Sequence, residues 1–340
     1  MYEIAKKSWF VFGLAVACLL VGGARGQHAE ADGKTIIRYA TLAPAGSAFG
    51  KILKAWGRSL SKETEGRVEF RYYSGGSQGD ERDFVRKMRA GQMDAAGVTT
   101  TGLGIVVRPV LVLSAPGVIE TYEELGRVRE KMNERFAEMF EEAGFVLLAW
   151  SDAGKGRLMS MDPILKPTDL KAHRPWAWKD DPMFAEFLKV VGANPVRLGV
   201  PEVYAALQTK MVDVVPSSAI GAVALQWYTK LNYMDKDSFG IILGASVVKR
   251  EKFDQLSPAD QKVLRDTAVR AAEALDQVVR RDDAKAYDVL LGRGIQEVDT
   301  SPYRADWDKA AADTRERLTG RIFSKSLLAD VQAAAKGTGP

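Results

Sequence analysis

Cysteine and histidine are nearly absent from this sequence of 340 residues. It contains one cysteine, Cys18, and two histidines, His28 and His173. Because Cys18 lies within an N-terminal leader, the rest of the chain can form no disulfide and offers no thiol nucleophile. Two isolated histidines do not make a zinc site or a facial triad of metal ligands. We therefore predict that the protein binds neither a metal nor a cofactor.

Signatures of catalysis and of nucleotide binding are also missing. No Gly-x-Ser-x-Gly elbow occurs, and the Gly-rich turn 74–79 lacks the Gly-Lys-Ser/Thr ending of a phosphate loop. A general base would have to be His173 or one of the scattered carboxylates. The sequence thus favours a binding protein, and an exported two-lobed enzyme stays open as an alternative.

Net charge is low. The formal charge is +4, and Lys6, Lys7 and Arg25 against Glu3 place +2 of it in the leader, which leaves +2 for the remaining chain. So weak a field argues against a nucleic-acid partner.

Residues 1–26 predict a signal peptide, in which Lys6 and Lys7 precede an apolar run at 9–21 and small residues at 22–24. The 13 residues of this run are short for a membrane-spanning helix. We therefore predict an exported, periplasmic protein with a polar linker at 27–34. Residues 15–18 loosely resemble a lipobox, so lipid anchoring through Cys18 is an alternative to ordinary cleavage.

One pattern of elements occurs twice in the remaining chain. Apolar periodicity predicts strand, helix, strand, helix and strand at 35–42, 47–64, 67–73, 80–90 and 93–99. The same order recurs at 172–178, 181–191, 195–199, 201–210 and 212–216. This predicts an α/β periplasmic-binding-protein fold with two lobes and two open, mostly parallel sheets. Ligands of such sheets bind beyond the carboxyl ends of the strands, so we expect the site in the cleft between the lobes.

The other segments complete the predicted domain organisation. A buried strand at 145–150 is the expected crossing point, with lobe I at 35–150 plus 239–256 and lobe II at 151–238. Ser257, Pro258 and Asp260 predict the capped start of a lobe-spanning helix at 257–291. We expect a helical region at 292–332 and a disordered tail at 333–340.

Several residues at strand ends and turns are candidate ligand contacts. Hydroxyl groups at the ends of predicted strands suit hydrogen bonding to a polar solute in the cleft, and the Gly-rich turn offers free amides. These candidates are Thr41, Gly76, Thr99, Thr100, Ser217 and Ser218. The alternative is that the hydroxyls cap the following helices and that the glycines form a structural turn.

Six segments together resemble one family of binding proteins. They are Ser74-Gly-Gly-Ser-Gln-Gly-Asp-Glu81, Ala90-Gly-Gln-Met-Asp94, Asp169-Leu-Lys171, Gly192-Ala-Asn-Pro195, Glu202-Val-Tyr-Ala-Ala-Leu-Gln208 and Lys252-Phe-Asp-Gln-Leu-Ser257. They resemble, in family order, the substrate-binding subunits of TRAP transporters, the DctP-like family. The resemblance implies an extracytoplasmic two-lobed protein that delivers a small solute to the membrane permease subunits and catalyses nothing. We expect a monomer or a weak dimer; a sensor subunit for a membrane receptor is an alternative function.

The resemblance also implies a departure at the site. Most members bind organic acids through an arginine on the strand after the Asp-Leu-Lys step, and Trp176 stands there in this sequence. Arg174 is two residues away, and Arg157 best matches a second basic position of the family. Without the first arginine, a hydrophobic monocarboxylate or a neutral ring compound is favoured over a dicarboxylate, whose second charge would be buried unpaired.

Tryptophans are candidates for the apolar part of the site. Trp176 and Trp178 alternate onto one face of a predicted strand, and Trp150 ends the predicted crossing strand. Together they would form an aromatic wall for the ligand. Packing between a lobe and its helices is the alternative role for all three.

Overall fold

The computed structural model describes residues 33–338. The predicted signal peptide, Cys18 and nearly all of the predicted linker lie outside these residues. Residues Lys34–Pro340 form one unit. Within the described part of the chain, no helix combines the length and the apolar character that a membrane span requires.

The repeated pattern of elements is confirmed. The first copy is β1 (Thr35–Thr41), α1 (Ala48–Glu63), β2 (Val68–Tyr73), α2 (Glu81–Arg89) and β3 (Ala95–Thr99). The second copy is β5 (Trp176–Trp178), α5 (Pro182–Val190), β6 (Val196–Leu198), α6 (Val200–Gln208) and β7 (Val214–Ser217). Strand β1 lies between β2 and β3, parallel to both, and β5 pairs in parallel with β6 and contacts β7 through a parallel bridge from Pro175 to Val214. We call the elements around β1, β2 and β3 lobe I, and those around β5, β6 and β7 lobe II.

Both copies also share an ion pair. In lobe I, Arg38 on β1 binds Asp94, which precedes β3, with 2.7 Å between Nη2 and Oδ1. In lobe II, Arg174 before β5 binds Asp213, which precedes β7, with 2.9 Å between Nη2 and Oδ2. In each pair the aspartate also accepts a hydrogen bond from the backbone N–H of the arginine. The equivalent positions show that these arginines hold adjacent strands together.

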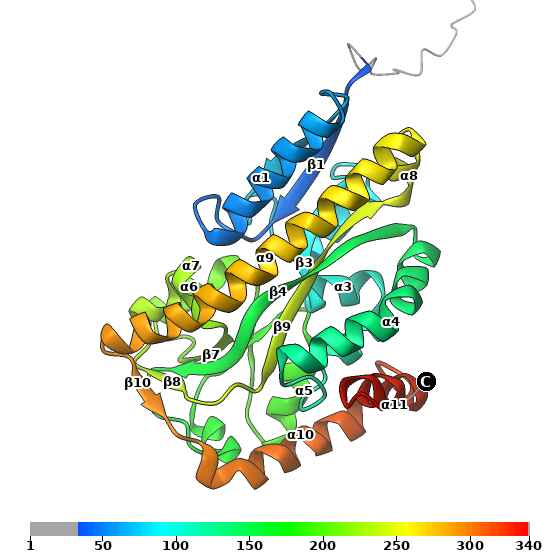
Figure 1. Ribbon diagram of the computed structural model, residues 1–340. Helices are drawn as coiled ribbons and strands as arrows, with labels where there is room; N and C mark the ends of the chain where they lie inside the picture. The colour runs from blue at the N-terminus through cyan, green and yellow to red at the C-terminus, as the bar shows by residue number, and fades with distance from the viewer. Residues whose placement is uncertain (1–32, 339–340) are drawn as a thin grey trace, which may run out of the picture. The chain divides into compact units, whose positions relative to one another are not determined.

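Two long antiparallel strands connect the lobes. They are β4 (Phe145–Ser160) and β9 (Gly240–Lys249), which lie side by side in Figure 1. Strand β9 pairs with β3 of lobe I, and β4 pairs with β9 from Phe145 to Gly156 and then with β7 of lobe II from Arg157 onward. The strands of lobe I and β7 of lobe II are therefore parts of one mixed sheet, which the short strands β8 (Tyr233–Asp235) and β10 (Gln296–Val298) extend beyond β4. Strands β5 and β6 form a separate two-stranded sheet, which the bridge from Pro175 to Val214 joins to β7.

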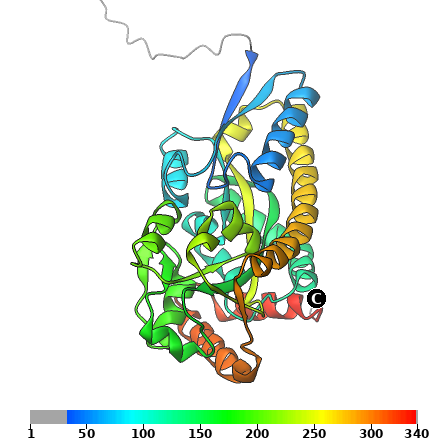
Figure 2. The same ribbon diagram turned by 90° about the vertical axis from the view of Figure 1, so that its left-hand side faces the viewer.

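The longest helix, α9 (Pro258–Gly292), packs against both lobes. Its 35 residues correspond to about 50 Å at 1.5 Å per residue. It contacts α1 in lobe I and α7 (Ala219–Ala224) in lobe II, and Figure 2 shows it in yellow to orange beside α1. At the lobe I end, Trp56 Nε1 donates to Thr267 Oγ1 over 3.0 Å.

Aspartates of α9 also fix the connecting strand β4. Asp276 accepts a hydrogen bond from the N–H of Asp152 over 2.7 Å, and Asp283 accepts one from Lys155 over 3.0 Å. The ladder between β4 and β9 shifts register between Asp152 and Gly154. Such a bulge leaves backbone groups without strand partners, and the α9 carboxylates bind them instead.

The remaining elements cover the sheet and close its edges. They are α3 (Thr100–Val106), η2 (Arg108–Ser114), α4 (Tyr122–Glu142), η3 (Pro167–Ala172), η4 (Trp227–Lys230), α8 (Arg250–Asp254), η5 (Ser301–Tyr303), α10 (Arg304–Leu318) and α11 (Lys325–Ala335). The tail predicted to be disordered from 333 begins within α11, where Ala334 and Ala335 are buried against α4 of lobe I. The Ala/Gly-rich composition predicts disorder, but these small side chains are ordered because they pack against apolar residues of lobe I.

Candidate functional site

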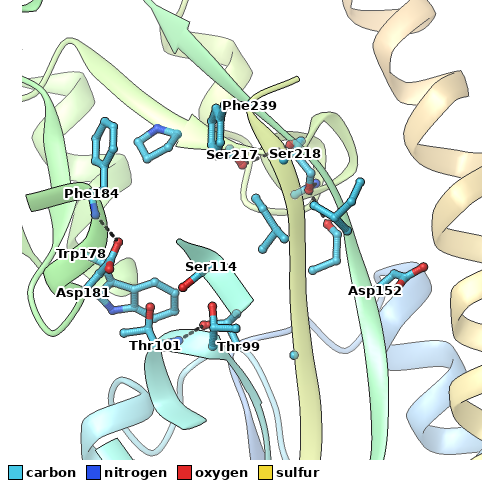
Figure 3. A pocket seen from close by; sticks show the side chains of 18 of the residues that line it. Thr99, Thr101, Ser114, Asp152, Trp178, Asp181, Phe184, Ser217, Ser218 and Phe239 are labelled. Atoms are coloured by element: carbon cyan, nitrogen blue, oxygen red, sulfur yellow. Dashed lines mark hydrogen bonds between the residues drawn. The ribbon is translucent and has the colours of Figure 1, made fainter. Parts of the chain in front are cut away.

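A cavity of about 440 Å³ lies between the lobes, a volume suited to a small organic molecule. Its lining comes from the carboxyl ends of β1 and β3 in lobe I, from β5, α5 and β7 in lobe II, and from the connecting strands β4 and β9. Figure 3 shows part of this lining, with Thr99 and Thr101 below and Phe184, Ser217 and Ser218 above. The ends of the parallel strands thus face the cavity, as the doubled fold predicts.

Seven of the residues predicted to contact the ligand line this cavity. They are Thr41, Thr99, Thr100, Trp176, Trp178, Ser217 and Ser218. These residues come from four separate stretches of the chain, and the fold brings them together.

Four other predicted residues do not line the cavity. Trp150 lies in the lobe I core, where its Nε1 donates to Asn133 over 3.0 Å. Arg174 forms the ion pair described above, on a largely exposed side chain. Gly76 adopts a left-handed turn with φ of +71°, next to Pro201 of lobe II.

The fourth is Arg157, the residue expected to fix an acidic group. Its guanidinium carbon lies 4.6 Å from the centre of the Tyr287 ring on α9, and its charge acts on Asp235 of β8. The register shift at Gly154 changes which face of β4 each later residue presents. The expected anchor for a carboxylate is therefore absent from the lining.

Most hydroxyl groups of the cavity already have partners. Thr99 Oγ1 accepts from the N–H of Thr101 and donates to Glu81, and Ser218 Oγ caps α7 while donating to the carbonyl of Ala153. Ser217 Oγ donates to the carbonyl of Ser218, and Thr41 Oγ1 accepts from the N–H of Ala43. Capping and turn formation are thus the roles that the structure gives to these side chains.

Thr100 and Thr101 differ from them. Both are buried, at 8% and 7% exposure, and neither hydroxyl has a hydrogen-bond partner within residues 33–338. In Figure 3 the hydroxyl of Thr101 points toward Trp178 and Asp181. A ligand in the cavity would find free hydroxyl groups at the start of α3.

Two groups of aromatic rings line the lobe II side. Trp176 and Trp178 lie with centroids 6.1 Å apart, and Trp176 meets Trp227 edge-on at 5.2 Å. Phe184, Phe187 and Trp307 stack in sequence, at 5.9 Å and 6.0 Å. No local pattern in the sequence indicates this second group, because Phe184 and Phe187 are part of an ordinary apolar helix pattern and Trp307 belongs to the C-terminal region.

Charge in the lining is predominantly acidic. The acidic lining residues are Glu81, Glu120, Asp152, Asp181, Asp235, Asp237 and Asp308. Arg304 is the one basic lining residue among those described, and it is held by Glu120 at 2.9 Å and Asp308 at 2.7 Å. No arginine or lysine in the described lining is free to receive a carboxylate.

Burial shifts the pKa of several of these carboxyl groups. It raises the pKa of Glu81 to about 8, although Thr99 and Gly102 donate hydrogen bonds that favour the ionised form. It raises the pKa of Asp235 to about 8, against a backbone hydrogen bond and the charge of Arg157. It also raises the pKa of Asp181, against hydrogen bonds from Met183 and Phe184.

The lobes also touch beside the cavity, at what we call the closure contact. Asp80, the N-cap of α2 in lobe I, accepts from Trp178 Nε1 over 2.8 Å and from the N–H of Val200 over 3.2 Å. Arg82 of α2 forms an ion pair with Asp180 of lobe II. These five residues join the lobes directly, and we call the arrangement with this contact the closed form.

Nothing in the described lining resembles a metal site, since no group of three His, Cys, Asp or Glu side chains is arranged to hold an ion. Two lobes that enclose a cavity of this size define a protein that binds a small solute. The family DctP, bacterial extracellular solute-binding protein, family 7, matches residues 39–319. The chain belongs to this family and is a solute-binding protein of the TRAP type.

Relatives of known name and structure agree with this assignment. A solute-binding protein of Chromohalobacter salexigens is 27% identical over 226 residues, which cover 66% of this chain and 67% of the relative. A TRAP periplasmic solute-binding protein of Ralstonia eutropha, solved with (S)-2-acetolactate, has a TM-score of 0.84 at 22% identity and covers 89% of this chain and 99% of its own. The sugar acid binding protein of Advenella mimigardefordensis, in complex with galactonate, has a TM-score of 0.85 at 18% identity and covers 90% and 99%. At these identities the solved structures show a shared fold.

Proposed function

We propose that this protein captures a small, largely apolar solute without net negative charge in the periplasm and delivers it to the membrane subunits of a TRAP permease. The observation that carries the ligand class is the cavity lining, which combines aromatic rings with an excess of carboxyl groups and no free cation. A neutral ring compound is the simplest ligand of this kind. The hydrophobic monocarboxylate considered from the sequence depended on Arg157, which lies outside the lining.

Electrostatics supports this choice. A carboxylate transferred into a closed cavity loses its hydration, which costs several kcal/mol unless a cation or several donors replace it. Among residues 33–338, the lining offers the hydroxyl groups of Thr100 and Thr101 but no free guanidinium or ammonium group. The acids named with the Ralstonia and Advenella proteins are therefore poor candidates for this chain.

Transport fits the arrangement better than catalysis does. A ligand that contacts both lobes stabilises the closed form, and closure by hinge motion gives the permease a signal that the site is occupied. The family consists of solute-binding proteins. We propose that the protein acts as a monomer or weak dimer, without turnover of its ligand.

Mass spectrometry of the solute that copurifies with the protein tests this function, together with thermal-shift measurements on matched panels of acids and neutral ring compounds. We expect neutral or aromatic solutes to raise the melting temperature, as binding at about 100 times Kd adds roughly 2.7 kcal/mol to the stability. Succinate, galactonate and glucuronate should cause no shift. Micromolar binding of any of these three acids would contradict the proposed ligand class, and turnover of a bound solute would contradict the transport role.

A further inference from the structure

The lining contains one carboxyl group whose surroundings suit a positive charge. Asp181 is the N-cap of α5, where Oδ1 accepts from the N–H of Met183 over 2.7 Å and Oδ2 from the N–H of Phe184 over 3.4 Å. A carboxylate has about four acceptor positions, so part of its capacity is unused. Asp181 is densely surrounded by protein atoms, and the part of its surface that is accessible lines the cavity.

No cation of the described chain neutralises Asp181. The nearest positive charge that acts on it is Arg197, whose side chain is exposed and donates to the carbonyl of Lys179 instead. Asp181 makes no ion pair with any described residue, whereas Glu120 and Asp308 share Arg304. An unpaired carboxyl group at the edge of a closed, aromatic cavity leaves room for a charge partner on the ligand.

The surfaces around this carboxyl group complete such a site. Trp178 lies beside Asp181, and Phe184 lies on its other side (Figure 3). Indole and benzene faces attract organic cations by about 0.5–2 kcal/mol when water is excluded. Across the cavity, the unpartnered hydroxyl of Thr101 points toward Asp181 and is available to an ammonium N–H.

We infer that the solute carries an organic cation, an alkylammonium group or its methylated form, which binds Asp181 between Trp178 and Phe184 with its apolar remainder against the other rings. This inference rests on the proposed function and deepens it, because it assigns the sign of the charge at one place in the same cavity. An ammonium group lowers the net negative charge of the lining, and Asp181 is the residue that would discriminate it from an uncharged analogue.

Binding of three matched probe series to the purified protein tests this inference. The probes are ammonium and trimethylammonium salts, alcohols and carboxylates, each built on benzyl, cyclohexylmethyl and indolylmethyl groups. We expect the best ammonium probe to bind at least ~10-fold more tightly than its alcohol, since about 1.4 kcal/mol corresponds to a factor of ten. The Asp181→Asn variant keeps an N-cap of equal quality. It should lose about 10-fold or more of the ammonium affinity and keep the alcohol affinity within about 2-fold.

Asp162→Asn is the matched control, because Asp162 is exposed and does not line the cavity. It should leave both affinities unchanged. Absence of binding by every ammonium probe, or an equal loss of ammonium and alcohol binding in Asp181→Asn, would overturn the inference. Alcohols binding most tightly with no effect of Asp181→Asn would overturn it while the proposed function stands. Carboxylates binding most tightly would overturn both.

Discussion

At the residue scale, the single buried carboxyl group of Glu81 fixes the backbone where β3 ends and α3 begins, at the lobe I side of the cavity. It is 2% exposed and accepts hydrogen bonds from Thr99 N and Gly102 N over 2.7 Å each, and from Thr99 Oγ1 over 2.9 Å. These bonds hold the start of α2 against the junction of β3 and α3. The hydroxyl groups of Thr100 and Thr101 are thereby held in the cavity lining.

Glu81 predicts a specific dependence of stability on pH. Its pKa is raised to about 8 in the folded protein, while an unfolded chain has a glutamate pKa of about 4.3. Between these values the native state holds a proton that the unfolded state has released, so the free energy of unfolding falls as pH rises through this window. Glu81→Gln removes this titration. As the pH rises from about 5 to about 8, the free energy of unfolding of the variant should therefore increase by a few kcal/mol relative to that of the wild type.

Thermal or urea unfolding of both proteins across this pH range measures the effect. The other titrating groups, Asp235 included, are common to the two proteins and cancel in the difference. Parallel stability curves for wild type and Glu81→Gln would show that Glu81 is ionised throughout.

At the element scale, β4 and β9 decide how the lobes are connected. Gly154 on β4 has φ of +106°, and a Cβ there would lie 2.6 Å from Cβ of Ser218 and 2.9 Å from Oδ1 of Asp283. Position 154 must therefore be glycine for two reasons: its backbone is left-handed, and there is no space for a Cβ. Because the ladder also changes register here, β4 bends at this point between its pairing with β9 and its pairing with β7.

Gly154→Ala should therefore destabilise the protein strongly. The left-handed backbone and the two close contacts together cost about 3 kcal/mol or more. Gly144→Ala is the matched control, since Gly144 has φ of +81° with nothing within 4 Å of its Cβ. It should lose roughly 1 kcal/mol from backbone strain alone. Equal losses in urea unfolding would show that Gly154 has free space and is not a packed junction.

Local signals explain why the doubled βαβαβ pattern was predictable. The helices α1, α2 and α9 begin after Ser47, Asp80 and Ser257, whose side chains cap them. The predicted strands of lobe I fall within two residues of β1, β2 and β3. By contrast, β4 runs ten residues beyond the predicted end at 150, because its pairing with β9 and β7 is non-local and overrides the polar and glycine residues in its second half.

The candidate site was predictable to the same extent. Strand ends and the alternation of Trp176 and Trp178 depend on local geometry, and these residues line the cavity. The direction of Arg157 depends on a register shift three residues earlier, which no local pattern reveals. The sequence predicts that a helix starts at Asp181, and Asp181 is the N-cap of α5. Its exposure to the cavity depends on lobe I, which lies far away in the sequence.

At the scale of the whole molecule, the connections between the lobes are of two kinds. Helix α9 and the strands β4 and β9 join the lobes through continuous packing and ladders. The closure contact of Asp80 and Arg82 with Trp178, Asp180 and Val200 joins them by a few polar bonds. A wider opening of the cavity requires that some of these links break. The polar closure contact is the weaker set, since a hydrogen bond to a charged group contributes only about 1.5–3 kcal/mol net and an exposed ion pair about 0–1 kcal/mol.

Trp178→Phe tests the closure contact, because it removes the indole N–H that Asp80 accepts and keeps an aromatic ring in the lining. The closed form should lose about 1.5 kcal/mol or more, which raises the rate of ligand dissociation roughly 10-fold or more. Trp150→Phe is the control, since Trp150 Nε1 donates to Asn133 within lobe I over 3.0 Å and the residue does not line the cavity. It should lower the melting temperature and leave dissociation nearly unchanged. Stopped-flow release of the copurifying solute measures both, and equal dissociation rates in the two variants would place the barrier to opening elsewhere than at Asp80.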